Sequence, residues 1–225
     1  MHDSINGDLS LRVTVDANVL SWTPSPSGTV WRKRLHLVGP PESGQVTSMV
    51  RYEANSRFPV HDHPDGEEIL VLEGVFSDEH GDWPAGTYLL NPEGFRHAPF
   101  SRNGCDLFVK LRQFPGAERR HVVTNTIAMP WRTASHGRVI KPLYSQSGYS
   151  DTMRLEQWPP GWAGESSYPQ GAELFVLRGS FEDEQGTCRV HTWLRVPVGA
   201  QHRSHTDEGC MLYIKEGGLA YLRSG

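Results

Sequence analysis

The residues with the clearest chemical potential lie between positions 61 and 97. His61 and His63 are two positions apart, Glu67 follows four residues later, and His97 comes thirty residues after the glutamate. Two histidines at i and i+2 of a strand point to the same face, and a carboxylate and a third imidazole from a neighbouring strand can complete a pocket around a divalent cation. These four side chains are predicted to bind one divalent metal ion per chain.

The residues around this set indicate how the chain positions it. Pro92 and Gly94 are typical of a tight turn, which would bring His97 back to the first two histidines. Glu67 shares strand parity with both of them, whereas Glu68 should face the other way. Glu67 is therefore the predicted carboxylate ligand, and Glu68 is the alternative.

The two motifs that carry these residues resemble the motifs of the cupin superfamily, G-x5-H-x-H-x3,4-E-x6-G and G-x5-P-x-G-x2-H-x3-N. They depart from the pattern only where Asn55 replaces glycine and Ser101 replaces asparagine, and neither departure affects a predicted ligand. Within the superfamily, residues 61–79 resemble the cupin domain of ChrR-type anti-sigma factors, which act on extracytoplasmic-function sigma factors. This resemblance covers residues 20–112.

The sequence also contains an internal duplication. When the chain is shifted by 105 positions, residues 61–110 align without a gap to residues 166–215, and 19 of the 50 pairs are identical. Such self-similarity indicates a repeated structural unit. We expect two domains in tandem, an N-terminal cupin with an intact metal site (1–115) and a C-terminal cupin with a degenerate one (116–225).

The two copies differ at the predicted ligands. Ser166, Tyr168 and Ala172 align with the two histidines and the glutamate of the first copy, and only His202 remains opposite a ligand. An isolated imidazole is more often hydrogen-bonded inside a barrel than bound to metal. The second copy is predicted to be structural or to bind a ligand without metal.

Short apolar runs separated by turn residues predict an all-β chain. The runs 68–72, 106–111 and 174–177 are bounded by segments such as Pro-Asp-Gly and Asn-Pro-Glu-Gly, as expected for short strands. The cupin resemblance implies a double-stranded β-helix (jelly-roll) barrel in each half. It also implies that the leading strand of each copy crosses to the other barrel.

Charge and hydropathy limit the partners. The net charge is −4, and there is no basic patch for nucleic acid or for an anionic membrane surface. Residues 1–15 lack an apolar signal segment, and no apolar run is long enough to cross a bilayer. These features predict a cytoplasmic protein with a small-molecule ligand or substrate. A regulatory protein partner and a homodimer are both compatible with the sequence.

Two classes of function fit the predicted site. The ChrR resemblance implies a sensory or regulatory module. The alternative is an iron-dependent dioxygenase acting on a small ketone or diketone, because three histidines and one glutamate leave positions on the ion open. Zinc, iron, manganese and nickel all accept this ligand set, with zinc or iron favoured. The zinc-binding helical domain of the anti-sigma family should carry a C-x2-C pair; the three cysteines here lack that spacing, so direct binding of a sigma factor is not expected.

The residues that would contact a substrate are less specific. Strand parity suggests that Arg51, Tyr88 and Phe108 face the first pocket, where aromatic rings and a cation would orient a small molecule. No catalytic residue is assigned from the sequence.

Overall fold

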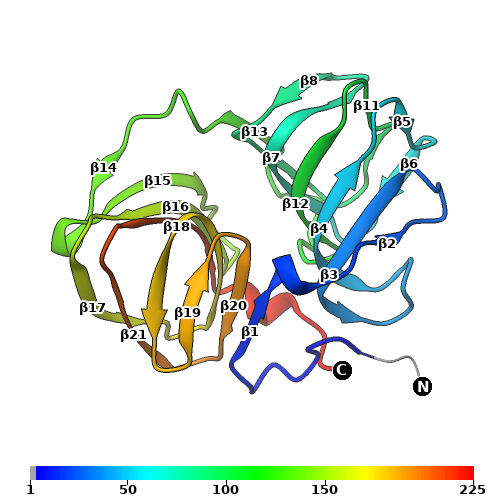
Figure 1. Cartoon of the computed structure of the whole chain (residues 1–225). Helices are drawn as coiled ribbons and strands as arrows, with labels where there is room; N and C mark the ends of the chain where they lie inside the picture. The colour runs from blue at the N-terminus through cyan, green and yellow to red at the C-terminus, as the bar shows by residue number, and fades with distance from the viewer. Residues whose placement is uncertain (1–3) are drawn as a thin grey trace. The chain divides into compact units, whose positions relative to one another are not determined.

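The structure is a computed structural model that describes residues 4–225. The chain divides into two compact units. The first barrel comprises residues 4–7, 20–128 and 223–225, and the second barrel comprises residues 8–19 and 129–222. The regular secondary structure of each unit is almost entirely antiparallel strand (Figure 1). The all-β prediction is confirmed.

The first barrel contains twelve of the strands. They are β2 (Thr23–Pro24), β3 (Val30–Val38), β4 (Gln45–Tyr52), β5 (Ser56–Arg57), β6 (His61–His63), β7 (Glu67–Asp78), β8 (Gly81–Pro84), β9 (Thr87–Asn91), β10 (Phe95–His97), β11 (Phe100–Ser101), β12 (Cys105–Leu111) and β13 (Val122–Asn125). The main sheet has the order β13-β9-β7-β12-β4-β3-β2, and β6 and β10 form a separate two-stranded sheet. The long strand β7 also pairs with β8 and β11.

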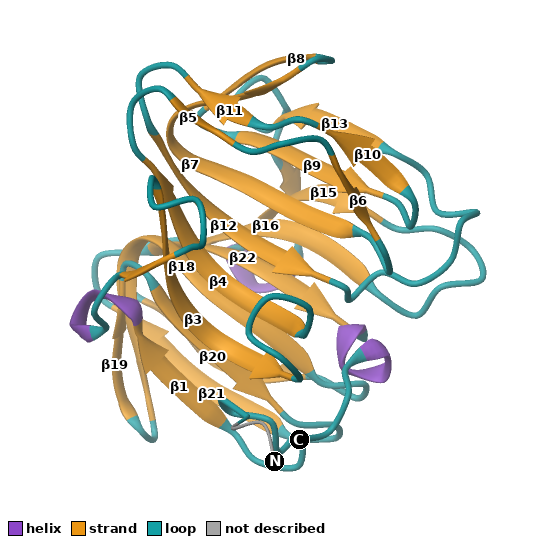
Figure 2. Ribbon diagram, turned by 90° about the vertical axis from the view of Figure 1, so that its right-hand side faces the viewer, coloured by secondary structure: helices purple, strands orange, loops and turns teal. Residues whose placement is uncertain are grey.

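The second barrel repeats this arrangement. Its strands are β1 (Val13–Asp16), β14 (Arg132–Thr133), β15 (Val139–Tyr144), β16 (Thr152–Trp158), β17 (Trp162–Ser167), β18 (Ala172–Asp183), β19 (Gly186–Arg189), β20 (Thr192–Val196), β21 (Gln201–Thr206) and β22 (Cys210–Glu216). The main sheet has the order β1-β20-β18-β22-β16-β15-β14. The helical turns in the described part are the short 3-10 segments η1 (Ala17–Val19), η2 (Ser135–Gly137) and η3 (Gly218–Tyr221) (Figure 2).

The leading strand of each copy joins the sheet of the other copy. β1 pairs antiparallel with β20, and β13 pairs antiparallel with β9. A single boundary at residue 115 would therefore separate β13 from its own sheet. The compact units consequently interrupt each other in sequence instead of meeting at that residue.

Repeated residues hold equivalent places in the two barrels. Gly74 and Gly179 have φ values of 73° and 70°, and an added Cβ atom would lie 2.2 and 2.1 Å from the carbonyl oxygens of residues 104 and 209. No side chain fits there, so glycine is required. Cys105 and Cys210, the residues paired with these glycines, are buried free thiols in the apolar cores. Within residues 4–225, no helix is long and apolar enough to span a membrane.

Candidate metal centre and cavity

The two-stranded sheet of β6 and β10 brings three histidines of the first barrel together. In its antiparallel register His97 lies opposite His61, and Phe95 lies opposite His63. One ring nitrogen from each histidine lies within 4.8 Å of the other two. The turn before β10 has the predicted form, with Gly94 at a φ of 81°. Sequence spacing and turn chemistry thus produce the histidine cluster.

Glu67 begins β7 and directs its carboxylate at this cluster. Its Oε2 atom lies 3.5 Å from Nε2 of His63 and 3.6 Å from Nε2 of His97. The neighbouring Glu68 points to the other face of the strand, where its Oε1 atom accepts a 2.8 Å hydrogen bond from the hydroxyl of Tyr88. The structure brings Glu67, and not Glu68, to the histidines. Its role as a metal ligand remains a prediction.

Two of the imidazoles are oriented by oxygen acceptors behind them. Nδ1 of His61 lies 2.9 Å from the carbonyl oxygen of Pro59, and Nδ1 of His97 lies 3.0 Å from Oδ2 of Asp78. A carbonyl or carboxylate oxygen only accepts, so each Nδ1 carries the hydrogen and donates it. This leaves the Nε2 lone pair of each ring available to a metal, which is the usual outer-shell arrangement for histidine ligands.

The donor atoms are arranged for a cation. Nε2 of His63 and Nε2 of His97 are only 2.9 Å apart, and both rings are buried. Two imidazole lone pairs at that distance need a shared proton or a positive ion between them. The amide of Asn91 donates a 2.9 Å hydrogen bond to Oε2 of Glu67 and so fixes the carboxylate beside them. Three nitrogens and one carboxylate oxygen fit a divalent transition metal.

The surroundings shift the pKa values of the two buried rings in opposite directions. Burial, which disfavours the charged imidazolium, lowers the pKa of His63 despite the opposing charge of Glu67. Burial also acts to lower the pKa of His97, but the hydrogen bond to Asp78 and the charge of Glu67 outweigh it, so the pKa of His97 is raised. As the pH falls, protons would therefore compete with a metal at His97 at a higher pH than at His63.

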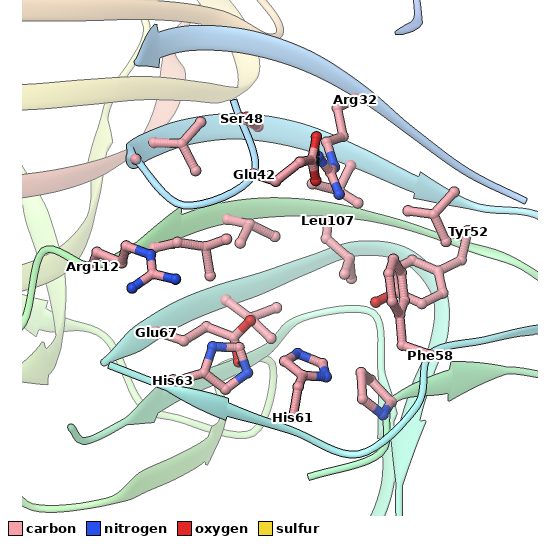
Figure 3. A pocket seen from close by; sticks show the side chains of 18 of the residues that line it. Arg32, Glu42, Ser48, Tyr52, Phe58, His61, His63, Glu67, Leu107 and Arg112 are labelled. Atoms are coloured by element: carbon pink, nitrogen blue, oxygen red, sulfur yellow. Dashed lines mark hydrogen bonds and ion pairs between the residues drawn. The ribbon is translucent and has the colours of Figure 1, made fainter. Parts of the chain in front are cut away.

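The cluster faces a cavity of about 300 Å³ within the first barrel. His61, His63 and Glu67 lie along one wall (Figure 3). Most of the remaining lining is apolar, and it comprises Val30, Val46, Val50, Tyr52, Phe58, Ile69, Phe76, Leu107, Val109 and Leu111. A small, mainly apolar molecule fits such a space with one polar group at the histidines.

Arg51 does not face this cavity, contrary to the expectation from sequence. The lining residues of β4 are the even-numbered ones from 46 to 52, so Arg51 lies on the opposite face. There its guanidinium forms a bidentate ion pair with Asp106, at 2.8 and 2.6 Å, and stacks over Trp22. The prediction placed Arg51 on the wrong face of the strand.

The prediction that Tyr88 and Phe108 face the cavity is wrong for the same reason. Leu107 and Val109 of β12 line the cavity, so Phe108 between them faces the other side of the sheet. Tyr88 points to the face on which its hydroxyl meets Glu68. These three side chains are therefore not pocket residues.

Charged pocket residues that sequence reasoning missed lie on two sides of the cavity. Arg32 and Arg34 of β3 both bind the carboxylate of Glu42: Nη1 of Arg32 lies 2.8 Å from each oxygen, and Nη2 of Arg34 lies 3.2 Å from one. Arg112, directly after β12, also lines the cavity. Its φ of 60° is left-handed, and the duplication, which aligns it with Gly217, is the signal that could have identified it.

The second barrel has lost this site. His202 is turned over relative to the histidine it matches, because its Nε2 atom, and not Nδ1, lies 3.0 Å from the carboxylate of Asp183. Ser166 lies opposite His202 in the strand register, and Tyr168 and Ala172 are buried apolar packing residues. Among residues 4–225, the first barrel has the one cluster of three His, Cys, Asp or Glu side chains whose ligand atoms converge.

The ChrR Cupin-like domain family matches the chain twice, at residues 10–115 and 119–220. The chain belongs to this family. The two matches agree with the tandem cupin organisation predicted from the duplication. A search of the curated proteins finds no match.

Solved structures similar to this ChrR-like cupin share its fold at low sequence identity. A putative dioxygenase from Nostoc punctiforme has a TM-score of 0.77 and 15% identity, covering 96% of this chain and 86% of its own. Protein Ylba from Escherichia coli has a TM-score of 0.71 and 13% identity, covering 94% and 93%. The bacterial pirin YhhW from E. coli, in complex with nickel(II), has a TM-score of 0.65 and 16% identity, covering 92% and 98%. Identities this low show the two-barrel fold alone.

Proposed function

We propose that the first barrel binds one divalent metal ion through His61, His63, Glu67 and His97, and that it binds a small oxygen-bearing molecule in the cavity beside that ion. The observation that carries this proposal is the convergence of three imidazole nitrogens, two of them from residues that line a cavity of about 300 Å³. The ion would supply a Lewis-acidic position at the wall of that cavity. Zinc and iron are the metals that we favour.

In this proposal the protein acts as a sensory or regulatory module. Membership of the ChrR Cupin-like family supports this role. The occupied cavity would alter the contact of this chain with a regulatory protein. Such regulation does not require the site to catalyse a reaction. Ligand binding alone can change the relative stability of two conformations.

The second candidate is an iron-dependent dioxygenase acting on a small ketone or diketone. The cavity next to the ligand set favours it, because an enzyme needs space for a substrate at the ion. Iron, when bound, supplies the oxygen chemistry of such a reaction. The residues of this chain would bind the substrate, enclose it among apolar side chains and limit the access of water.

Metal retention by matched glutamine variants tests the site. Glu67→Gln is expected to weaken metal binding at least about 100-fold, which exceeds the usual loss for an outer-shell group. Glu68→Gln is the control, because Glu68 lies on the other face of the same strand. Elemental analysis after dialysis reads out both. Equal retention by the two variants would contradict the assignment of Glu67.

Oxygen consumption distinguishes the two classes of function. The anaerobically purified protein is loaded with iron or with zinc and mixed with a panel of small diketones and ketones. The regulatory proposal expects ligand binding without sustained oxygen uptake. Uptake that follows the iron content and disappears in His97→Ala would establish the dioxygenase instead.

A further inference from the structure

The cavity of the first barrel contains one cation without an internal partner. Arg112 extends into it from the end away from Tyr52 and Phe58 (Figure 3). Across residues 4–225, its guanidinium makes no hydrogen bond or ion pair.

The other two arginines of the cavity differ in this respect. Arg32 and Arg34 share the carboxylate of Glu42, which is held by three contacts of 2.8 to 3.2 Å. Glu42 therefore neutralises much of their positive charge within the protein. Arg112 is the cation of the cavity that remains for a ligand to bind.

The backbone at Arg112 indicates that the side chain serves a purpose other than folding. Arg112 has a φ of 60°, and the equivalent Gly217 has a φ of 74°. The two residues donate equivalent hydrogen bonds, to the carbonyl of Gly66 at 2.9 Å and to that of Gly171 at 3.0 Å. Glycine is the residue that this conformation favours, and it occurs in the copy without the ligand set. The copy that has the histidines carries arginine there.

The same conformation places the guanidinium in the cavity. Leu111 lines the cavity, so a regular strand would direct the next side chain to the opposite face. The left-handed residue breaks this alternation, and Arg112 also lines the cavity. Non-glycine residues held in this region of φ cluster at ligand sites.

We propose that Arg112 binds the carboxylate of a small organic acid whose apolar body occupies the cavity beside the histidine cluster. This inference rests on the proposed function and specifies its class of ligand. An arginine fork matches a carboxylate in a bidentate pair, and the apolar lining accepts a short hydrocarbon chain. A single unpaired arginine also favours a monoanion over a phosphate dianion.

Calorimetric titration with 4-methylpentanoate and its uncharged amide, 4-methylpentanamide, tests the proposal. We expect the full-length protein to bind the acid at least tenfold more tightly than the amide. Arg112→Gly, which suits the backbone, should abolish that preference, and Arg112→Lys should keep part of it. Arg51→Gln is the control and should retain the preference, because Arg51 lies on the face of β4 away from the cavity.

The outcomes separate this inference from the metal proposal. Each titration is made with the metal-loaded protein and after chelation, and the metal content is measured by elemental analysis. An acid preference that is absent in the wild type, unchanged in Arg112→Gly or lost equally in the Arg51→Gln control would overturn the role of Arg112. Loss of metal from Arg112→Gly would also overturn it, because the arginine would then act on the metal site. A wild type that retains no metal, yet prefers the acid through Arg112, would refute the metal proposal alone.

Discussion

The two barrels share one fold, but their interiors differ in how they are filled. The first keeps a histidine cluster and a cavity, whereas the second fills the corresponding space with larger side chains. Three cavity-facing positions of β4 correspond to three positions of β16, because both strands pair with equivalent partners, β12 and β22. The residues are Ser48, Val50 and Tyr52 in β4, and Arg154, Glu156 and Trp158 in β16.

The charges of the second barrel are satisfied by one another. Glu156 accepts hydrogen bonds from Arg138 at 3.0 Å, from Arg154 at 2.8 Å and from the indole of Trp158 at 3.0 Å. In the first barrel, by contrast, His61, His63 and Arg112 line the cavity. The first copy therefore has polar side chains available to a ligand in its cavity, whereas the equivalent region of the second copy is occupied by side chains that neutralise one another.

The largest expected effect would come from removing the histidine cluster. We expect the wild type to retain about one metal ion per chain and the double variant His61→Ala, His63→Ala to retain almost none, because His202 has no comparable partners. Elemental analysis after dialysis measures the stoichiometry. A double variant that still held about one ion would place a second site in the other barrel and break the comparison.

A substitution in the packed barrel should affect stability more than one in the open barrel. Trp158→Ala is expected to cost about 3–5 kcal/mol, because removing a fully buried indole that packs against Trp162 leaves a cavity. Tyr52→Ala, at the register-equivalent position, should cost less, since its ring already borders open space. Urea unfolding of both variants gives the two free energies. Equal losses would show that the first cavity is not a pre-existing space.

The sequence was sufficient for the parts of this comparison that depend on spacing. The motif residues, the turn at Gly94 and the 105-residue shift predicted the all-β fold and the convergence of the histidines. Glu67 could be separated from Glu68 because strand parity is counted from fixed neighbours, the two histidines.

The residues that sequence reasoning misplaced lie on strands in which most positions on both faces are buried. β4 and β9 show almost no alternation between buried and exposed residues. Hydropathy therefore cannot tell which face of each strand meets the cavity, or whether Arg51 and Tyr88 lie on that face. The sequence did not identify Arg112 as a cavity residue for another reason. Its left-handed backbone reverses the alternation of side chains that a regular strand would give. The packing of Trp158 against Trp162 depended on long-range register, which spacing alone does not reveal.

The aspartates behind the two matching histidines provide a third comparison. Asp78→Asn is expected to weaken metal binding about 10–100-fold, because the acceptor that orients His97 loses its charge. The pKa of His97 is raised against the effect of burial by Asp78 and Glu67, so protons now compete with metal at a comparatively high pH. The variant should lower that pKa, so the pH range over which metal affinity falls on acidification should shift to lower pH, below a weaker maximum affinity.

Competition titrations with a metal indicator between about pH 5 and 8 measure this shift. Asp183→Asn is the matched control in the second barrel, where the carboxylate meets His202 and Arg12. It should leave metal affinity unchanged. A pH dependence that moved equally in both variants would mean that the effect is not local to the first site.

The smallest effect is expected where the two backbones are most alike. Arg112→Gly should change the free energy of unfolding by no more than about 1 kcal/mol, because relief of a left-handed arginine is offset by the greater freedom of glycine in the unfolded chain. Gly217→Ala should be destabilising by more than about 1 kcal/mol, since its Cβ would lie 2.3 Å from the carbonyl oxygen of Ser150. Urea midpoints of the two variants test this. A large loss in Arg112→Gly would show that the arginine stabilises the barrel, and its position in the cavity would then be explained by folding instead of by a ligand.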